Sequence, residues 1–176
     1  MLPAGATWVH ELVRDIPDYP RPGVEFRDIT PLLGDAAGFA RAIDSLVDRF
    51  ADTPVDRVLG VEARGFIVAA PVAYRLRAGF VPVRKAGKLP WAVAREEYAL
   101  EYGTDKLEIH RDAIHPGEHI LVIDDVLATG GTAAATCRLV EVLGGAVVGL
   151  GFLIELAALG GRGALGERHV ESLAVY

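Results

Sequence analysis

A pair of acids followed by a turn rich in glycine and threonine occupies residues 124–132. The apolar run 120–123 leads into Asp124 and Asp125, and two glycines and two threonines follow. Backbone N–H groups at the start of a helix bind anions, and glycine lets the backbone approach a phosphate closely. Adjacent carboxylates accept hydrogen bonds from neighbouring hydroxyl groups of a sugar. We therefore predict a ribose 5-phosphate site, with the acids on the ring hydroxyls and the turn on the phosphate.

Other common phosphate-binding loops do not match this segment. No lysine follows the glycines, as it does in a Walker A loop, and the GxGxxG spacing of a dinucleotide site is absent. An ordinary strand-to-helix turn, in which an aspartate caps the helix and a glycine eases the bend, would use some of the same residue types. The paired acids together with the paired threonines favour the binding site over that simple turn.

Positive charge is concentrated in residues 84–90 of a chain whose formal net charge is −6. Arg84, Lys85 and Lys88 stand within five positions, and the chain has only three lysines. A solvated basic turn would have the same composition. Because this segment follows a predicted strand and opens a long polar stretch, we expect it to lie over the site and neutralise an anionic leaving group.

Strands and helices alternate along the chain and must position these residues. Apolar residues recur at three- and four-residue spacing over 35–50, which predicts an amphipathic helix with Asp35 as its N-cap. The remaining predicted elements are strands at 57–61, 80–84, 119–123 and 146–154, helices at about 66–77 and 132–143, and a hairpin pairing 98–100 with 106–109. Such alternation predicts an α/β fold, a mainly parallel twisted sheet with helices on both faces. Its active site is expected at the carboxyl ends of the strands.

Composition sets the broad class. With 176 residues, 51% of them hydrophobic, the chain fits a single domain with one sizeable core. An acidic balance argues against a nucleic-acid coat or an anionic-membrane binder, because both need a positive field. Cys137 is the single cysteine, which excludes an intramolecular disulfide and favours a reducing compartment. Residues 1–10 do not resemble a signal peptide, and we find no membrane-length apolar run, so we expect a cytoplasmic protein.

The acid-and-glycine segment closely resembles the phosphoribosyl-pyrophosphate (PRPP) signature of type I phosphoribosyltransferases. This resemblance implies that Asp124 and Asp125 contact the ribose hydroxyls. The 5-phosphate would be held by Ala128, Thr129, Gly130, Gly131 and Thr132.

Residues 24–31 resemble the base-binding segment of the adenine branch of that family. Phe26 would stack on a purine, Arg27 would pack on the ring, and the Val24 backbone would read the exocyclic amine and a ring nitrogen. A simpler interpretation makes Phe26 a core anchor and Arg27 a surface charge.

Two further segments resemble the family's pyrophosphate site. Residues 62–66 follow the strand 57–61 and match the pyrophosphate loop, in which the family often has a cis peptide; here it would join Glu62 and Ala63. The basic segment 84–90 matches a motif from which an arginine reaches the neighbouring subunit, so Arg84 would act in trans in a homodimer. The implied pyrophosphate-binding residues are Glu62, Ala63, Arg64, Arg84, Lys85 and Lys88.

Residues from about 84 to 110 resemble the family's flexible catalytic loop, and about 1–34 its small N-terminal hood. Glu101 matches the proposed catalytic acid/base, and Tyr102 belongs to the lid that excludes water. A surface glutamate in a hairpin is the simpler alternative for Glu101. Trp91 and His110 receive no chemical role.

Together these matches imply a purine salvage enzyme that converts adenine and PRPP to AMP and pyrophosphate. Arg64 and Lys88 would assist catalysis with Glu101, and Mg²⁺ would be held mainly by PRPP oxygens and water, with no metal ligand assigned to the protein. One alternative is a phosphoribosyltransferase for hypoxanthine, guanine or xanthine. Another is a PRPP-sensing regulatory module. The sequence argues against this module, because about 25 residues precede the base segment, too few for a winged helix, and the net charge is negative.

Overall fold

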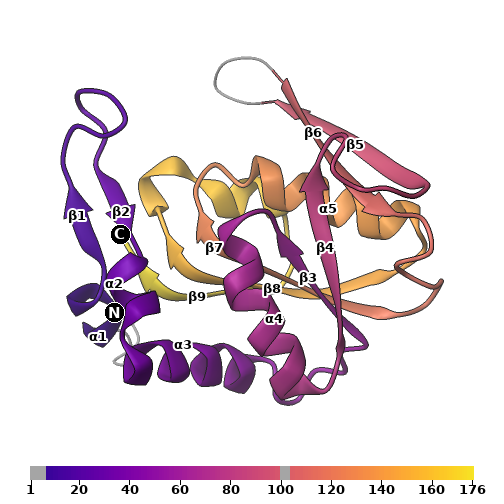
Figure 1. Cartoon of the computed structure of the whole chain (residues 1–176), viewed down its shortest axis with the longest axis horizontal. Helices are drawn as coiled ribbons and strands as arrows, with labels where there is room; N and C mark the ends of the chain where they lie inside the picture. Colours follow the sequence, from indigo (N-terminus) through magenta and orange to yellow (C-terminus); the bar gives the residue numbers. More distant parts are fainter. Residues whose placement is uncertain (1–6, 100–103) are drawn as a thin grey trace.

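A seven-stranded sheet forms the centre of the computed structural model, which describes residues 7–99 and 104–176 (Figure 1). Its strand order is β5-β6-β4-β3-β7-β8-β9, and the five strands from β4 to β9 run parallel. The strands β6 and β5 extend one edge in antiparallel pairing. The strands are β3 (Arg57–Val61), β4 (Gly79–Lys85), β5 (Val93–Ala99), β6 (Thr104–His110), β7 (His119–Leu127), β8 (Ala146–Glu155) and β9 (Val170–Val175).

Helices cover both faces of the sheet, as the sequence predicted (Figure 1). The helices α3 (Ala36–Arg49) and α4 (Arg64–Leu76) pack on one face, and α5 (Gly131–Val142) packs on the other. Asp35 is confirmed as the N-cap of α3, because its carboxylate accepts a hydrogen bond of 2.6 Å from the Gly38 amide.

Alternation along the buried strands produces a core on each side of the sheet. In β7, Leu121 and Ile123 pack with α3 and α4, whereas Ile120 and Val122 pack on the α5 side. A strand buried on both faces reads as a continuous apolar run, which is the pattern the sequence has here. The last residues of β7 extend past this run, so the strand itself carries both acids to the carboxyl edge of the sheet.

A small two-stranded sheet stands apart at the N-terminal side (Figure 1). Its strands β1 (Arg14–Ile16) and β2 (Phe26–Asp28) pair antiparallel. The sequence predicted neither these two short strands nor β9 (Val170–Val175). The remaining short elements are α1 (Thr7–Glu11), α2 (Thr30–Gly34), η1 (Ala157–Leu159) and η2 (Gly161–Leu165). In the described ranges, no helix has the length and apolar character needed to cross a membrane.

Candidate active site

Two neighbouring parallel strands, β3 and β7, bring the pyrophosphate-loop match and the acid pair to the same edge of the sheet. The strand β3 ends at Val61, and α4 begins three residues later at Arg64. A Cβ on Gly65 would lie 2.5 Å from the Asp124 Oδ1 atom. Glycine at position 65 therefore lets the start of α4 approach the acid pair closely.

An ion pair joins these two segments directly. The Arg64 Nε atom lies 2.6 Å from Asp125 Oδ2, and the Asp125 side chain is only 9% exposed. The Arg64 guanidinium carbon also lies 5.5 Å from the centre of the Phe26 ring. Arg64, from the pyrophosphate-loop match, thus lies against both the segment assigned to the ribose and the segment assigned to the base.

Asp124 is unusual in its ionisation. Burial and the neighbouring Asp125 carboxylate raise the pKa of Asp124 well above its usual range. Its Oδ1 atom still accepts a hydrogen bond of 2.9 Å from the Asp125 amide. A carboxyl group that is costly to ionise and points into a cavity is typical of a functional site, because it serves a ligand at the expense of stability.

This arrangement predicts that Asp124→Asn stabilises the protein. Because the folded-state pKa of Asp124 is raised, its contribution to stability falls as pH rises from the ordinary carboxyl range through that raised pKa. We expect the variant to melt about 2–4 °C above the wild type at pH 8, with a smaller difference at pH 5. Melting curves of both proteins at the two pH values test this, with the exposed Asp52→Asn as control. A variant less stable than the wild type at both pH values would contradict the account.

A cavity of about 80 Å³ lies in the turn before α5. It is lined by Asp124 and residues 126–133, which include all five residues assigned to the 5-phosphate. Gly130 has φ +81°, a left-handed conformation that favours glycine, and α5 begins at the next residue. The first N–H groups of α5 are therefore available beside this cavity.

A larger cavity of about 430 Å³ adjoins the first along β3 and β7. Among the described residues lining it are Glu62, Ala63, Arg64 and Lys85 from the predicted pyrophosphate set, together with Asp125. The Glu62–Ala63 peptide is cis, as the resemblance suggested.

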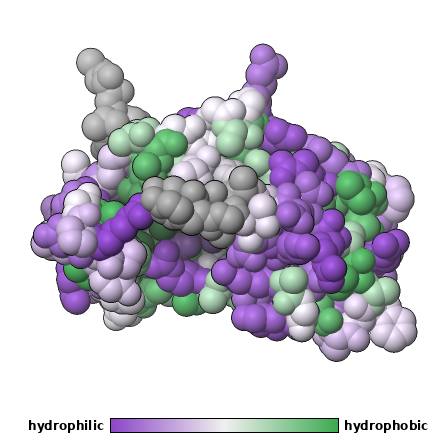
Figure 2. All heavy atoms as spheres, turned by 90° about the horizontal axis from the view of Figure 1, so that it is seen from above, coloured by the Kyte–Doolittle hydropathy of each residue, from purple (hydrophilic) through white to green (hydrophobic). Residues whose placement is uncertain are grey.

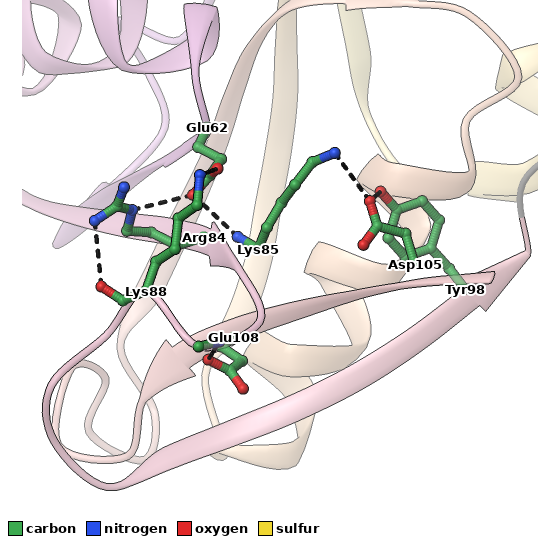
Figure 3. A network of polar contacts seen from close by, with 8 residues as sticks. Glu62, Arg84, Lys85, Lys88, Tyr98, Asp105 and Glu108 are labelled. Carbon is green, nitrogen blue, oxygen red and sulfur yellow. Dashed lines mark hydrogen bonds and ion pairs between the residues drawn. The ribbon is translucent and has the colours of Figure 1, made fainter.

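Arg84 and Lys88 are oriented toward Glu62 (Figure 3). The Arg84 Nε atom lies 3.0 Å from Glu62 Oε2, the Lys88 Nζ atom 2.8 Å from Oε1, and the Lys85 amide donates to Oε2 at 3.0 Å. Burial alone would raise the pKa of Glu62, but these hydrogen bonds from Lys88, Lys85 and Arg84 lower it. Since a carboxylate only accepts hydrogen bonds, the Glu62 side chain holds the cations together, which is a different task from contacting an anionic ligand.

Lys85, the third cation of the basic segment 84–90, also has an acidic partner. The Lys85 Nζ atom lies 3.1 Å from Asp105 Oδ2 on β6, and the Tyr98 hydroxyl lies 3.4 Å from the same oxygen (Figure 3). Tyr98 and Lys85 both line the larger cavity. The antiparallel edge strands therefore form one wall of the site.

A third cavity, of about 290 Å³, lies between the small sheet and the end of β7. Val24, Phe26 and Arg27 line it, as do Arg64 and Asp125. The surface of this cavity is the most apolar of the three, and Glu25, Val126, Ala128 and Leu156 complete its wall. An aromatic ring and a mostly apolar surface, with charged side chains at fixed positions, suit a flat heteroaromatic base.

Arg27 has a more specific place than the sequence indicated. Its guanidinium lies 4.4 Å from the centre of the Tyr176 ring and forms ion pairs with Asp15 and with Glu25, the latter at 2.8 Å. Its side chain is mostly buried, so it is not the surface charge of the simpler interpretation. Arg27 thus fixes the small sheet to the last residue of the chain.

Sequence reasoning missed Leu156 and Tyr176. Leu156 directly follows β8, which neighbours β7, so the rule that sites lie at the carboxyl ends of strands would have found it. Tyr176 follows the unpredicted strand β9, and no local motif marks it. Glu101 and Tyr102 lie outside the residues that the structure describes. Seen from above, hydrophilic side chains cover much of this face of the molecule, with smaller hydrophobic areas between them (Figure 2).

The chain matches known proteins both in sequence family and in fold. The family model described as phosphoribosyl transferase domain matches residues 29–168. An adenine phosphoribosyltransferase of Acidothermus cellulolyticus is 60% identical over 161 residues, which cover 92% of this chain and 91% of that protein. One from Chloroflexus aurantiacus is 57% identical, covering 94% of this chain and 95% of that protein.

Solved structures give the same result. The adenine phosphoribosyltransferase of Thermoanaerobacter pseudethanolicus superimposes with a TM-score of 0.93 at 48% identity, covering 96% of this chain and 98% of that one. The Saccharomyces cerevisiae enzyme, solved with an imino-altritol bisphosphate and adenine, gives a TM-score of 0.89 at 37% identity. That match covers 94% of this chain and 96% of the yeast chain.

Proposed function

This chain belongs to the phosphoribosyltransferase family, among its adenine-specific members, and we propose that its three adjoining cavities divide the substrates between them. The enzyme transfers the 5-phosphoribosyl group of PRPP to adenine, which gives AMP and pyrophosphate. The observation that carries the assignment of the cavities is the Arg64–Asp125 ion pair. Both residues line the base cavity and the larger cavity, so they mark the point where the reacting atoms must meet.

In this proposal the acids bind the sugar. Asp124 and Asp125 accept hydrogen bonds from the ribose hydroxyls, and the turn 128–132 binds the 5-phosphate through backbone N–H groups and threonine hydroxyls. Phe26 holds the purine ring, with Val24 reading its edge. The cavity around Phe26 supports this role, because it combines an aromatic ring with mostly apolar walls.

Positive charge stabilises the departing pyrophosphate. Arg64 and Lys85 line the cavity assigned to it. Arg84 and Lys88 form ion pairs with Glu62, which lines the same cavity. Fixed cations that face developing negative charge lower the barrier without reorganisation at the moment of reaction. Glu101 acts as a general acid/base toward a proton of the purine, while the purine N9 atom attacks C1 of the ribose.

We also propose Mg²⁺ as the cofactor. In the described ranges, no group of three or more His, Cys, Asp or Glu side chains is arranged to hold a metal ion. Carboxylates and phosphate oxygens are nevertheless the donors that Mg²⁺ prefers, and Asp124 and Asp125 stand beside the pyrophosphate cavity. When bound, mainly through PRPP oxygens and water, the ion would neutralise charge on the leaving group.

A homodimer through α4 and β4 is a further part of the proposal. Ile67 and Tyr74 are exposed on one face of α4, two turns apart, and Tyr74 is 83% exposed. Phe80 on the adjacent strand β4 is exposed as well. Alternation along β4 places Arg84 on the same face as Phe80, so association through this apolar patch would bring Arg84 to the boundary with the partner's site.

Tyr74→Arg should separate the proposed dimer. A charge at the centre of an apolar contact would be buried without a partner, which opposes association. Sedimentation velocity should give a dimer for the wild type and a monomer for the variant, with lower activity at equal chain concentration. Val142→Arg, at an apolar position on α5 that is 71% exposed, is the control and should remain dimeric. A Tyr74→Arg protein that sediments with the wild type would contradict this interface.

A cytoplasmic location is also proposed. Cys137 is a buried free thiol, and burial raises its pKa to about 11. A protonated, buried thiol of this kind is inert and behaves as part of the core. Its state suits a reducing compartment, where disulfides are rare.

The direct experiment mixes the protein with labelled adenine, PRPP and Mg²⁺. Labelled AMP and an equal amount of pyrophosphate are the expected products, and EDTA should suppress both. A PRPP-sensing module would bind PRPP and release no pyrophosphate, so this assay separates the two functions.

A further inference from the structure

The turn η2 lies directly against the segment that we assign to the 5-phosphate. A Cβ on Gly161 would lie 2.3 Å from the Ala128 carbonyl oxygen, and a Cβ on Gly130 would lie 2.4 Å from the Gly161 carbonyl oxygen. Real Cβ atoms are essentially never found so close to another atom. The two backbones therefore touch because both positions are glycine.

An ion pair fixes η2 in this place. The Arg162 Nε atom lies 2.8 Å and 3.0 Å from the two Glu155 carboxylate oxygens, and a second guanidinium nitrogen lies 2.8 Å from Oε2. Arg162 also donates to the Val170 carbonyl oxygen at 3.0 Å. A guanidinium with this many fixed partners holds its backbone in one position.

Glu155 is itself a rigid anchor. It is the last residue of β8, its side chain is 8% exposed, and the Ser172 hydroxyl on β9 donates to it at 2.8 Å. Burial would raise the pKa of Glu155, but the hydrogen bonds from Arg162 and Ser172 lower it, so the carboxylate stays charged. The Leu156 amide next to it donates to the Leu127 carbonyl at 2.9 Å, which ties this anchor to the end of β7.

We propose that Gly161 and Arg162 are positioning residues that hold the phosphate-binding turn in its working geometry and so set the affinity for PRPP. The proposal rests on the function given above. Neither residue lines the three cavities among the described residues. Their effect passes through the backbone at Ala128 and Gly130, whose N–H groups must stay within hydrogen-bond geometry of a phosphate.

Gly161→Ala and Gly163→Ala form a matched pair of variants. Both lie in the same short turn, but a Cβ on Gly163 meets nothing within 4 Å, whereas one on Gly161 meets backbone. For Gly161→Ala we expect the KM for PRPP to rise at least about tenfold, with the KM for adenine changed less than about twofold. Gly163→Ala should match the wild type in both constants.

Arg162→Gln provides a second route if Gly161→Ala does not fold. It should raise the KM for PRPP and spare the KM for adenine, and Arg162→Lys should restore part of the loss, because lysine keeps the charge without the two-pronged contact. Calorimetry with PRPP alone reports binding without turnover. If the wild type and the Gly161 and Arg162 variants bind PRPP equally, the positioning role is wrong and the proposed function stands. If the wild type itself does not bind PRPP, the proposed function fails.

Discussion

Glu101→Ala should lower kcat by about 10²–10⁴-fold while PRPP affinity changes little, because general acid–base catalysis contributes on that scale. The residue lies outside the described part of the chain, between the strands β5 and β6. Those strands contribute Tyr98 and Leu107 to the wall of the pyrophosphate cavity. Steady-state kinetics for kcat and titration calorimetry for PRPP binding measure the two effects separately.

Glu97→Ala is the matched control for this prediction. Glu97 is on the same hairpin, but its exposed carboxylate pairs with Lys106 at 3.2 Å, away from the cavities described here. A surface ion pair of this kind contributes little, so activity should stay within about twofold of the wild type. If Glu101→Ala weakened PRPP binding as much as it lowered kcat, Glu101 would be a binding residue and the acid/base role would be wrong.

Arg64→Gln should lower kcat/KM by about 10²–10³-fold, the scale of removing one charge-stabilising donor from an active site. The change removes positive charge from the pyrophosphate cavity and leaves Asp125 buried without its ion-pair partner. We therefore expect a lower melting temperature as well as lower activity. Initial rates at varied PRPP and a thermal melt measure both.

Two comparisons isolate the role of Arg64. Arg75→Gln is the control on the same helix. Arg75 pairs with the half-exposed Asp44, so this variant should have the activity of the wild type. In the double variant Arg64→Gln/Asp125→Asn, stability should recover relative to Arg64→Gln while activity does not, because no charge is then left buried and unpaired. Because Asp125 is itself assigned to the ribose, stability is the diagnostic readout. A double variant that melts no higher than Arg64→Gln would contradict the account of Asp125 as a buried charge that needs Arg64.

Local patterns predicted most of the central fold. The strand Arg57–Val61 has the predicted bounds, and α3 begins after Asp35 as its capping residue required. These succeed because a buried parallel strand needs a continuous apolar run and an amphipathic helix needs a 3.6-residue period. The helix α4 begins at Arg64, two residues before the prediction, because its first turn contains the pyrophosphate-loop residues and lacks an apolar period.

Long-range contacts account for what the sequence did not predict. The strand β9 adds to the sheet edge beside β8, yet its residues carry no strong period or motif. Tyr176 reaches Arg27 across almost the whole chain, and Gly161 reaches Ala128 from a turn that looks like an ordinary glycine-rich connection. Pairings of this kind depend on topology, which local pattern does not encode.

The sequence also did not predict the ion-pair partners of the basic segment. The sequence placed Arg84, Lys85 and Lys88 near an anionic ligand, but it did not reveal that Glu62 and Asp105 hold these cations. A carboxylate one strand away is invisible to composition, although it decides whether a cation is free for a ligand. The pyrophosphate contact predicted for Glu62 stays a prediction, and the structure adds that the Glu62 carboxylate pairs with Arg84 and Lys88.

A four-base competition tests the central claim most directly. The protein is given PRPP, Mg²⁺ and equal amounts of adenine, hypoxanthine, guanine and xanthine, and the nucleotide products are separated and quantified. The mostly apolar base cavity and the close similarity to adenine phosphoribosyltransferases predict AMP as the overwhelming product, formed with an equal amount of pyrophosphate. Formation of IMP, GMP or XMP at a rate equal to or above that of AMP would contradict the account.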